Sequence, residues 1–323
     1  MRLYSITALL CIVSFLLPYN LIASDTDYYI KLLQYGTDSD IASTFDAIYD
    51  DLGTEVGNEV LDAFFESHSE NVRMSLVRYL GMAQKTNGGL REKTARLLAT
   101  ELSREGKSAD YSETLISAAG ETGAKSCIEP MRVIFRDETT PDRTRLAIVD
   151  AWGKIGDKSI EKLLLGLVKD DYEEKDIRAR AILALGEMDS TESIDTMKQI
   201  VENAYEPKLM RMYAVLSLSK IGQESVLETL ENALSDEDHD VATYAARGIA
   251  DLECTECGRI LMKALRSDYD RVRYYAVIGL AKLRFSESED ILKFKAEHDT
   301  NERVREEAKK ALESIAGGTE EKK

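Results

Sequence analysis

Two cysteines three residues apart, Cys254 and Cys257, are the residues of this chain whose spacing points most directly to chemistry. A Cys-x-x-Cys pair can form a local disulfide, exchange thiols or contribute to a metal site, and a redox pair normally sits at a helix N-terminus in a βαβ setting. Here the pair falls on a turn between two expected helices, and no strand is evident. Isoleucine or valine holds the place of Cys257 elsewhere in the chain (Ile160, Ile194, Val226). We therefore interpret the pair as structural, as a local disulfide or as buried thiols, with redox chemistry and metal binding as alternatives.

The histidines do not suggest a metal centre. There are three, His68, His239 and His298, each in a different expected loop and far apart in sequence. A site of four to six nitrogen and oxygen ligands cannot be assembled from them. The chain also lacks a GxSxG elbow, a P-loop, an HExxH pair and an EF-hand loop, and its carboxylates follow helix-surface spacing. We therefore predict that the protein is not an enzyme and holds no cofactor or metal.

A 13-residue phrase recurs nine times between Ile41 and Ala316, and its copies start 31 to 39 residues apart. This period is typical of stacked helical repeats. Counting the first residue of a copy as position 1, position 5 is alanine in the last five copies (Ala181, Ala214, Ala245, Ala276, Ala308). Position 9 is large and apolar in most copies (Leu80, Trp152, Leu185, Leu218, Ile249, Leu280, Leu312). This spacing is helical, and both positions are expected in the core.

Glycine is frequent at positions 10 and 13 of the phrase, where we interpret it as a helix stop signal (Gly81, Gly120, Gly153, Gly186; Gly53, Gly123, Gly156, Gly222). A second helical stretch follows each stop, for example at residues 159–170 and 193–204. One repeat is therefore a helix hairpin that buries its apolar face only by stacking on its neighbours.

Position 2 is arginine in six copies, and aspartates recur a few residues upstream (Arg73, Arg145, Arg178, Arg211, Arg273, Arg305; Asp137, Asp170, Asp236, Asp268, Asp299). Together with the alanine and leucine columns, this pattern resembles HEAT repeats, specifically the short HEAT-like repeats of the phycobilin-lyase type, over about residues 41–316. The resemblance implies an all-α, right-handed α-solenoid of about nine hairpins with an Arg–Asp ladder along one turn edge. It says little about function, because the family serves many tasks.

Some proteins with such repeats are enzymes. The di-iron deoxyhypusine hydroxylases resemble this chain in fold and use repeated His-Glu pairs as ligands, whereas its own histidines precede Ser69, Asp240 and Asp299. A lyase role depends on a partner subunit and on residues outside the repeat. We expect a non-catalytic scaffold or adaptor that binds a protein partner. The alternative is an enzyme subunit or maturation factor on a HEAT scaffold, either lyase-like or a metal-dependent oxidoreductase.

A candidate binding surface follows from the helical phase of the phrase. With positions 5, 9 and 12 in the core, position 7 points nearly opposite and position 4 lies at the edge of the buried stripe. Yet apolar or aromatic residues occupy these two positions in the middle of the array (Leu183, Tyr213, Leu216, Tyr244, Tyr275, Ile278). Exposed apolar residues in a line indicate an interaction surface, and tyrosine is favoured there. The alternative is that lateral packing covers them.

The ends of the chain differ from the repeats. Residues 1–24 hold one charge, an apolar run and small residues at Ala23 and Ser24, which predicts a signal peptide cleaved near these residues and an exported, bacterial-type protein in the periplasm or outside the cell. An uncleaved anchor is the alternative. Residues 25–316 are expected to be one repeat domain that begins with an extra helix at 26–35, with a seam near 84–110. Residues 317–323 are predicted to form a disordered charged tail.

The chain is acidic, with a formal net charge of −17 that becomes −18 without residues 1–24. This charge argues against nucleic acid as a partner. No second stretch is apolar enough to span a membrane, so the mature chain should lack a membrane span. Nine basic residues gather between Arg259 and Lys295. We interpret them as a solvated face, with a site for an anionic partner as the alternative.

Overall fold

The protein consists of helix hairpins. The computed structural model describes residues 26–48, 56–64, 69–83, 88–252 and 254–320, and these ranges contain eighteen α-helices and no strand. Each copy of the phrase begins near the start of one helix, which we call a first helix: α2 (Asp38–Ile48), α4 (Glu70–Ala83), α6 (Ala109–Thr122), α8 (Asp142–Ile155), α10 (Lys175–Glu187), α12 (Lys208–Ile221), α14 (His239–Asp251), α16 (Asp270–Lys282) and α18 (Glu302–Glu320). The second helices are α3 (Gly57–Phe64), α5 (Gly88–Leu102), α7 (Ile128–Arg136), α9 (Glu161–Lys169), α11 (Ile194–Glu202), α13 (Leu227–Ala233), α15 (Thr255–Ala264) and α17 (Glu289–His298).

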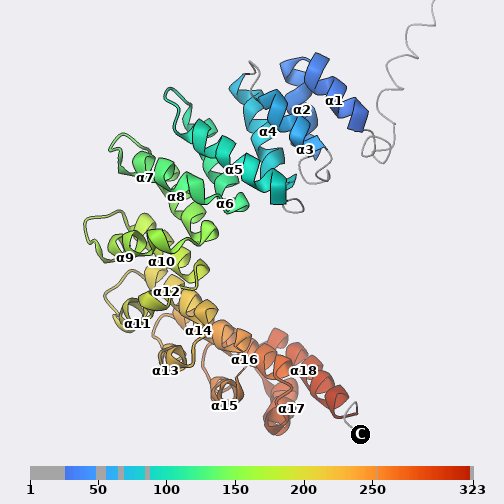
Figure 1. The fold of residues 1–323 in the computed structure, drawn as a ribbon. Helices are drawn as coiled ribbons and strands as arrows, with labels where there is room; N and C mark the ends of the chain where they lie inside the picture. Colours follow the sequence, from blue (N-terminus) through green and yellow to red (C-terminus); the bar gives the residue numbers. More distant parts are fainter. Residues whose placement is uncertain (1–25, 49–55, 65–68, 84–87, 253, 321–323) are drawn as a thin grey trace, which may run out of the picture. The chain divides into compact units, whose positions relative to one another are not determined.

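The helices form two compact units, residues 1–151 and 152–323, which divide inside α8. In the second unit α10, α12, α14, α16 and α18 follow one another side by side, and the second helices pack against this row (Figure 1). In the first unit α2, α4 and α6 are neighbours in the same way, with α3 and α5 against them. Each unit is an α-solenoid. Each hairpin contacts only its neighbours, since a solenoid has no common core, and the single domain expected over 25–316 stays a prediction. The seam predicted at 84–110 lies within the first unit, and its residues 84–87 are outside the described part.

The core lies where the phrase places it. The five alanines at position 5 are fully buried, as are six of the seven large residues at position 9. The exception is Leu312 on the last first helix, which is half-buried. A helix at the end of a row has a neighbour on one side only, so its core stripe is incompletely covered.

Small residues bring successive first helices into close contact. Position 10 of one first helix faces position 8 of the next, and one member of each pair is glycine (Gly153–Ala184, Gly186–Ser217, Ser219–Gly248 and Ala250–Gly279 in the second unit, Gly81–Ala118 in the first). A Cβ added to Gly186 would lie 2.6 Å from the Cβ of Ser217, and one added to Gly279 would lie 2.8 Å from the Cα of Ala250. We call these pairs the small-residue ladder.

The position-10 glycines were therefore misinterpreted as helix stops. Gly153 and Gly186 lie inside α8 and α10, where they allow close approach of the next helix. The stops are the position-13 glycines: Gly123, Gly156 and Gly222 have φ angles of 61°, 65° and 66°, in the left-handed region that favours glycine. Gly53 lies outside the described residues.

The position-2 arginines bind the end of the preceding hairpin and also form ion pairs within their own hairpin. The Arg178 and Arg211 guanidinium groups donate to the carbonyls of Val168 and Val201, in the last turn of the preceding second helix. Arginine can satisfy helix C-terminal carbonyls in this way. Arg211 also forms an ion pair with Asp236 of the following loop. In the first unit Arg73 and Glu101 form the equivalent pair, with 3.4 Å between Nη1 and Oε2.

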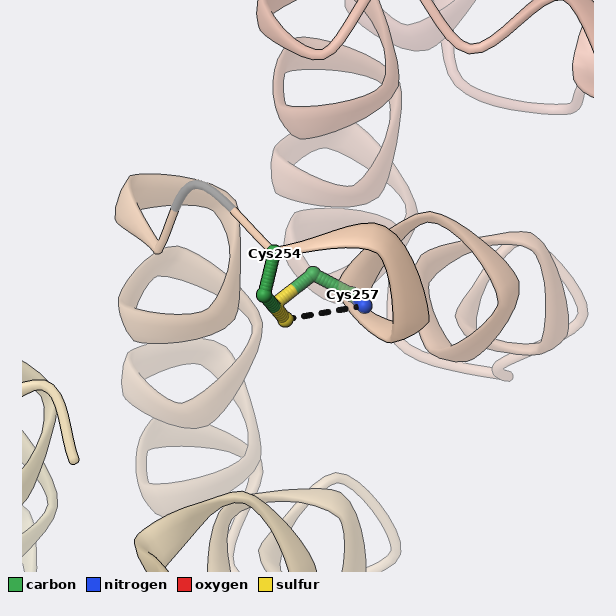
Figure 2. Close-up of a disulfide and its surroundings, with 2 residues drawn as sticks. All are labelled: Cys254 and Cys257. Carbon is green, nitrogen blue, oxygen red and sulfur yellow. Dashed lines mark hydrogen bonds between the residues drawn. A yellow bond between two sulfur atoms is a disulfide. The ribbon is translucent and has the colours of Figure 1, made fainter. Parts of the chain in front are cut away.

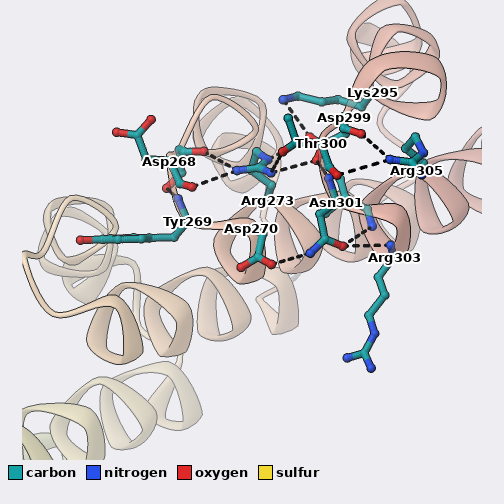
Figure 3. Close-up of polar contacts among 12 residues, drawn as sticks. Asp268, Tyr269, Asp270, Arg273, Lys295, Asp299, Thr300, Asn301, Arg303 and Arg305 are labelled. Carbon is teal, nitrogen blue, oxygen red and sulfur yellow. Dashed lines mark hydrogen bonds and ion pairs between the residues drawn. The ribbon is translucent and has the colours of Figure 1, made fainter.

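Arg273 makes the most complete of these connections (Figure 3). Its Nε and Nη2 donate to the two carboxylate oxygens of Asp299 at 2.9 and 2.8 Å, and its Nη1 donates to the carbonyls of Ser267 and Asp268. Both charged side chains are buried, being 8% and 1% exposed. Burial alone would raise the pKa of Asp299, but hydrogen bonds from Arg273, from the backbone N–H of Asn301 and from Lys295 outweigh it and lower the pKa to about 2. Asp236 and Asp299 belong to the predicted aspartate column and lie downstream of the arginines they pair with, whereas Arg178 pairs with the upstream Asp171 at 3.2 Å between Nη2 and Oδ1.

The two ends of the described chain are helical. The added N-terminal helix, α1 (Thr26–Tyr35), has the expected bounds. The signal peptide predicted at 1–24 lies outside the described residues. The disordered tail predicted at 317–323 is corrected in part, because α18 continues to Glu320. An established helix gains one hydrogen bond for each residue added. Residues 321–323 lie beyond the described range.

Two glycine substitutions test the small-residue ladder. Gly186→Ala should destabilise the protein by about 1–3 kcal/mol, because the new methyl group overlaps Ser217, including its Cα. Gly166→Ala, on an exposed position of α9 with no atom within 4 Å of the new Cβ, should stabilise it by about 0.5–1 kcal/mol. Urea melts measure both. Equal effects of the two changes would contradict close packing at the ladder.

The Arg273–Asp299 pair predicts a loss of stability in acid. Because the folded-state pKa of Asp299 is depressed from 3.8 to about 2, its contribution is present above pH 4 and is lost as the pH falls toward 2. The contribution should be roughly 2 kcal/mol. Urea melts between pH 5 and 2 measure it, and Asp299→Asn should flatten this part of the profile. Asp290→Asn, at an exposed side chain of α17, is the matched control, and an identical flattening there would refute the assignment.

Candidate protein-binding surface

The six residues predicted to form a binding surface lie on four neighbouring first helices of the second unit. Leu183 is on α10, Tyr213 and Leu216 on α12, Tyr244 on α14, and the last two, Tyr275 and Ile278, on α16. These helices contact one another in succession, so the structure brings the six residues to one row of helices. The sequence prediction of a common location is thus consistent with the fold.

The exposure of these residues is intermediate. All six are half-buried, whereas the interleaved Ala214, Val215 and Leu218 are buried and Lys220 is exposed. The expectation of fully exposed side chains therefore needs correction. The small-residue ladder accounts for this difference, because first helices that approach so closely leave less free surface at positions 4 and 7. A half-buried apolar side chain keeps part of its surface for a partner while its rotamer is constrained.

One residue of this surface was missed from the sequence. Leu209 precedes the copy of the phrase on α12 and is 38% exposed. It stands four residues before Tyr213 and seven before Leu216, a spacing that places all three on one side of the helix. The equivalent places in the flanking copies hold Asp176 and Asp240, so a comparison of the copies at this position does not indicate an apolar surface. We call the seven residues the apolar strip (Leu183, Leu209, Tyr213, Leu216, Tyr244, Tyr275, Ile278).

Ion pairs between first helices border the strip. Near the helix N-termini, Asp240 of α14 pairs with Lys208 of α12 and with Arg271 of α16, at 3.2 Å between Oδ1 and Nη1 in the second pair. The hydrogen bond from Lys208 holds the pKa of Asp240 below its usual range. Near the C-termini, Asp251 pairs with Lys282. The arrangement is an apolar centre with a charged rim, the anatomy of many protein–protein interfaces.

The basic residues between Arg259 and Lys295 are mostly neutralised. Seven of the nine form ion pairs (Arg259, Lys263, Arg271, Arg273, Lys282, Lys293, Lys295). In most cases the partner is an acidic residue of the same or the preceding hairpin. Two of the seven, Arg273 and Lys295, pair with Asp299. This arrangement favours the interpretation as a solvated face over a site for an anionic partner.

The two cysteines of the Cys-x-x-Cys pair are joined by a disulfide (Figure 2). Cys257 is fully buried at a place equivalent to Ile160 and Val226, which are also fully buried, and Cys254 is half-buried. Cys127 is a free, buried thiol in the first unit, and burial raises its pKa to about 12.

The histidines lie at helix ends instead of within loops. His239 begins α14 and His298 ends α17, while His68 is outside the described residues. Across the part of the chain that the structure describes, no three His, Cys, Asp or Glu side chains gather as a metal site would need.

Family comparisons agree with this geometry. A family model of HEAT repeats matches residues 160–250, the segment that contains α10, α12 and most of α14. Residues 160–250 of this chain are HEAT repeats. A model of the vitellogenin TPR domain, another helical repeat, matches residues 67–203. The comparison with curated protein sequences gives no match.

Solved structures with the same fold include long HEAT-type solenoids. The karyopherin Kap121p bound to the extreme C-terminus of the protein phosphatase Cdc14p aligns with 90% of this chain and 37% of its own length, at 10% identity and a TM-score of 0.54. Kap121p bound to Nup53p gives the same values. Human deoxyhypusine hydroxylase aligns over 86% of this chain and 97% of its own, at 16% identity and a TM-score of 0.35, a likeness too low to carry an argument. Among the described helices, none combines the length and the apolar character needed to cross a bilayer.

Three substitutions on α12 test the helical phase of this HEAT repeat. Leu218→Ala should cost about 2–5 kcal/mol, because the side chain is fully buried. Leu216→Ala should cost about 1 kcal/mol at its half-buried site, and Lys220→Ala should stay within about 0.5 kcal/mol. Urea melts give the order, and a loss at Leu216 as large as that at Leu218 would show that the strip belongs to the core.

Proposed function

We propose that this protein is a non-catalytic scaffold that binds a protein partner through the apolar strip of its second unit. The observation that carries this proposal is the continuity of the strip. Leu209, Tyr213 and Leu216 stand on α12, and half-buried tyrosines continue the strip on α14 and α16. Scattered single apolar residues are normal on a surface, whereas a line over adjacent elements is typical of an interaction site.

The chemistry of the strip suits a protein partner. Tyrosine offers a large apolar ring and a hydroxyl group at a low cost in rotamer entropy, and anchors of this type commonly contribute about 2 kcal/mol each. The rim pairs Lys208–Asp240 and Lys282–Asp251 add polar groups that remain in contact with water. A partner with an apolar segment long enough to cross the four helices of the strip would match it.

The fold supports binding without a large conformational change. The small-residue ladder fixes the spacing of α10, α12, α14 and α16, so the strip is pre-organised and little entropy is lost on binding. Kap121p is a solenoid of the same fold that binds protein segments, which agrees with the proposal although the identity is low.

Export of the protein is part of the proposal. The composition of residues 1–24 supports a cleaved signal peptide, and a disulfide between Cys254 and Cys257 suits an oxidising compartment. The partner would then be another protein of the periplasm or of the extracellular space.

Site-specific crosslinking tests the binding surface. The chain carrying p-benzoylphenylalanine in place of Tyr244 should give a discrete crosslinked adduct with a protein from native extract. Adding Leu209→Glu and Leu216→Glu should reduce the adduct about tenfold or more, because two carboxylates would have to be desolvated at the contact. Gel shift and mass spectrometry measure the yield.

The matched control is Phe294→Glu, an equally drastic change at a 59% exposed side chain of α17, on the other helix layer of the same unit. It should leave the adduct unchanged. Circular dichroism should show that all variants remain folded. An adduct that persists in the double glutamate variant, or one lost in the Phe294 variant, would move the binding site away from the strip.

A further inference from the structure

The hairpin that contains the disulfide differs from the other hairpins of the second unit. A short 3-10 turn precedes the second helix in the four others: η6 (Lys158–Ile160), η7 (Thr191–Ser193), η8 (Glu224–Val226) and η9 (Ser286–Ser288). In this hairpin α15 begins directly at Thr255, with Cys254 as its N-cap residue. The sequence places the pair on a turn, but the structure places it at a helix N-terminus.

The position of Cys254 favours a thiolate. Its backbone is extended, with φ −125° and ψ 147°, and its Sγ accepts the backbone N–H of Cys257 at 3.0 Å (Figure 2). In the reduced protein the same N–H and the positive end of the ten-residue helix would stabilise a negative sulfur. Cys254 is also half-buried, so this residue keeps part of its surface exposed to solvent.

Cys257 has the opposite environment. Its side chain is fully buried, and Gly258 beside it packs so closely under Phe285 that an added Cβ would lie 2.4 Å from the ring. A thiolate attacks a disulfide along the S–S axis and needs access to one sulfur. The attack is therefore directed at Cys254, and Cys257 is the leaving group and the resolving thiol.

Stabilisation of the fold does not explain this disulfide. It closes a loop with a sequence separation of three, the situation in which a crosslink removes least entropy from the unfolded chain. The equivalent places of neighbouring hairpins hold Ile160 and Val226, which are fully buried without a crosslink. The hairpin could be built without either sulfur.

We propose that Cys254 and Cys257 form a thiol–disulfide exchange site, whose reaction partner is an external dithiol. One thiolate of the dithiol bonds to the Sγ of Cys254, and the S–S bond breaks to leave Cys257 as a thiolate that takes up a proton. The second thiol of the partner, after losing its proton, then attacks the partner's own sulfur in the mixed disulfide. This step forms the partner's disulfide and releases Cys254 as a thiolate. Two electrons pass from the dithiol, which becomes a disulfide, to the protein, which becomes a dithiol. The reverse sequence oxidises the partner.

Alkylation and redox titration of the folded full-length protein test this proposal, with dithiothreitol as the dithiol. The disulfide should open in dithiothreitol without urea. In Cys257→Ser, iodoacetamide should modify Cys254 at pH 7 on the order of tenfold faster than it modifies Cys257 in Cys254→Ser, since the thiolate fraction of Cys254 is larger. The rate for Cys254 should reach half its plateau below about pH 8.5, the value of an ordinary thiol.

Cys127 is the internal control, because its buried thiol should stay unmodified in every variant until the protein unfolds. If Cys257→Ser does not fold, Cys257→Ala and peptide mapping of the reduced wild-type protein give the same comparison. A disulfide that opens only in urea, or a Cys254 that reacts no faster than Cys257, would overturn the proposal and leave the pair as a structural crosslink.

Discussion

Close contact between small residues on successive first helices is the constraint on which the rest of the second unit depends. Each pair joins position 10 of one helix to position 8 of the next, and the pair Gly186–Ser217 leaves no room for a methyl group. Because the helices are this close, the alanines at position 5 are fully buried, and the side chains at positions 4 and 7 of the apolar strip are half-buried instead of fully exposed. The same contact therefore sets both the core and the partial burial of the apolar strip.

The arginines at position 2 provide a second, directional connection. Each of Arg178 and Arg211 closes the end of the second helix before it. Arg211 and Arg273 also pair with an aspartate at the end of their own hairpin, just after its second helix. A buried charge pair with complete hydrogen bonding fixes geometry more than it adds stability, since desolvation offsets much of the attraction. In this chain the pair orients the arginine, whose remaining hydrogen bonds reach carbonyls of the preceding hairpin.

The local features of the fold follow from the sequence, and its contacts between repeats do not. The helices, the apolar columns and the stops at Gly123, Gly156 and Gly222 are encoded within each copy of the repeat, and residue spacing reveals them. The role of Gly186 depends on how hairpins stack, which no single copy encodes. The helical phase of the repeat correctly predicted that the six candidate residues lie on one row of first helices. How exposed their side chains are depends on how the hairpins stack. Leu209 was missed because charged residues hold the same place in the adjacent copies.

These features together describe a rigid row of helices that presents a partly exposed apolar strip with a charged rim. The measurement that tests this account most directly is hydroxyl-radical footprinting of the protein alone and bound to its crosslinked partner. Oxidation of Tyr213, Tyr244 and Tyr275 should fall on binding. Oxidation of Tyr172 and Tyr205, whose side chains are fully exposed on loops of the same unit, should stay the same. Protection of the two loop tyrosines without protection of the strip would contradict the account.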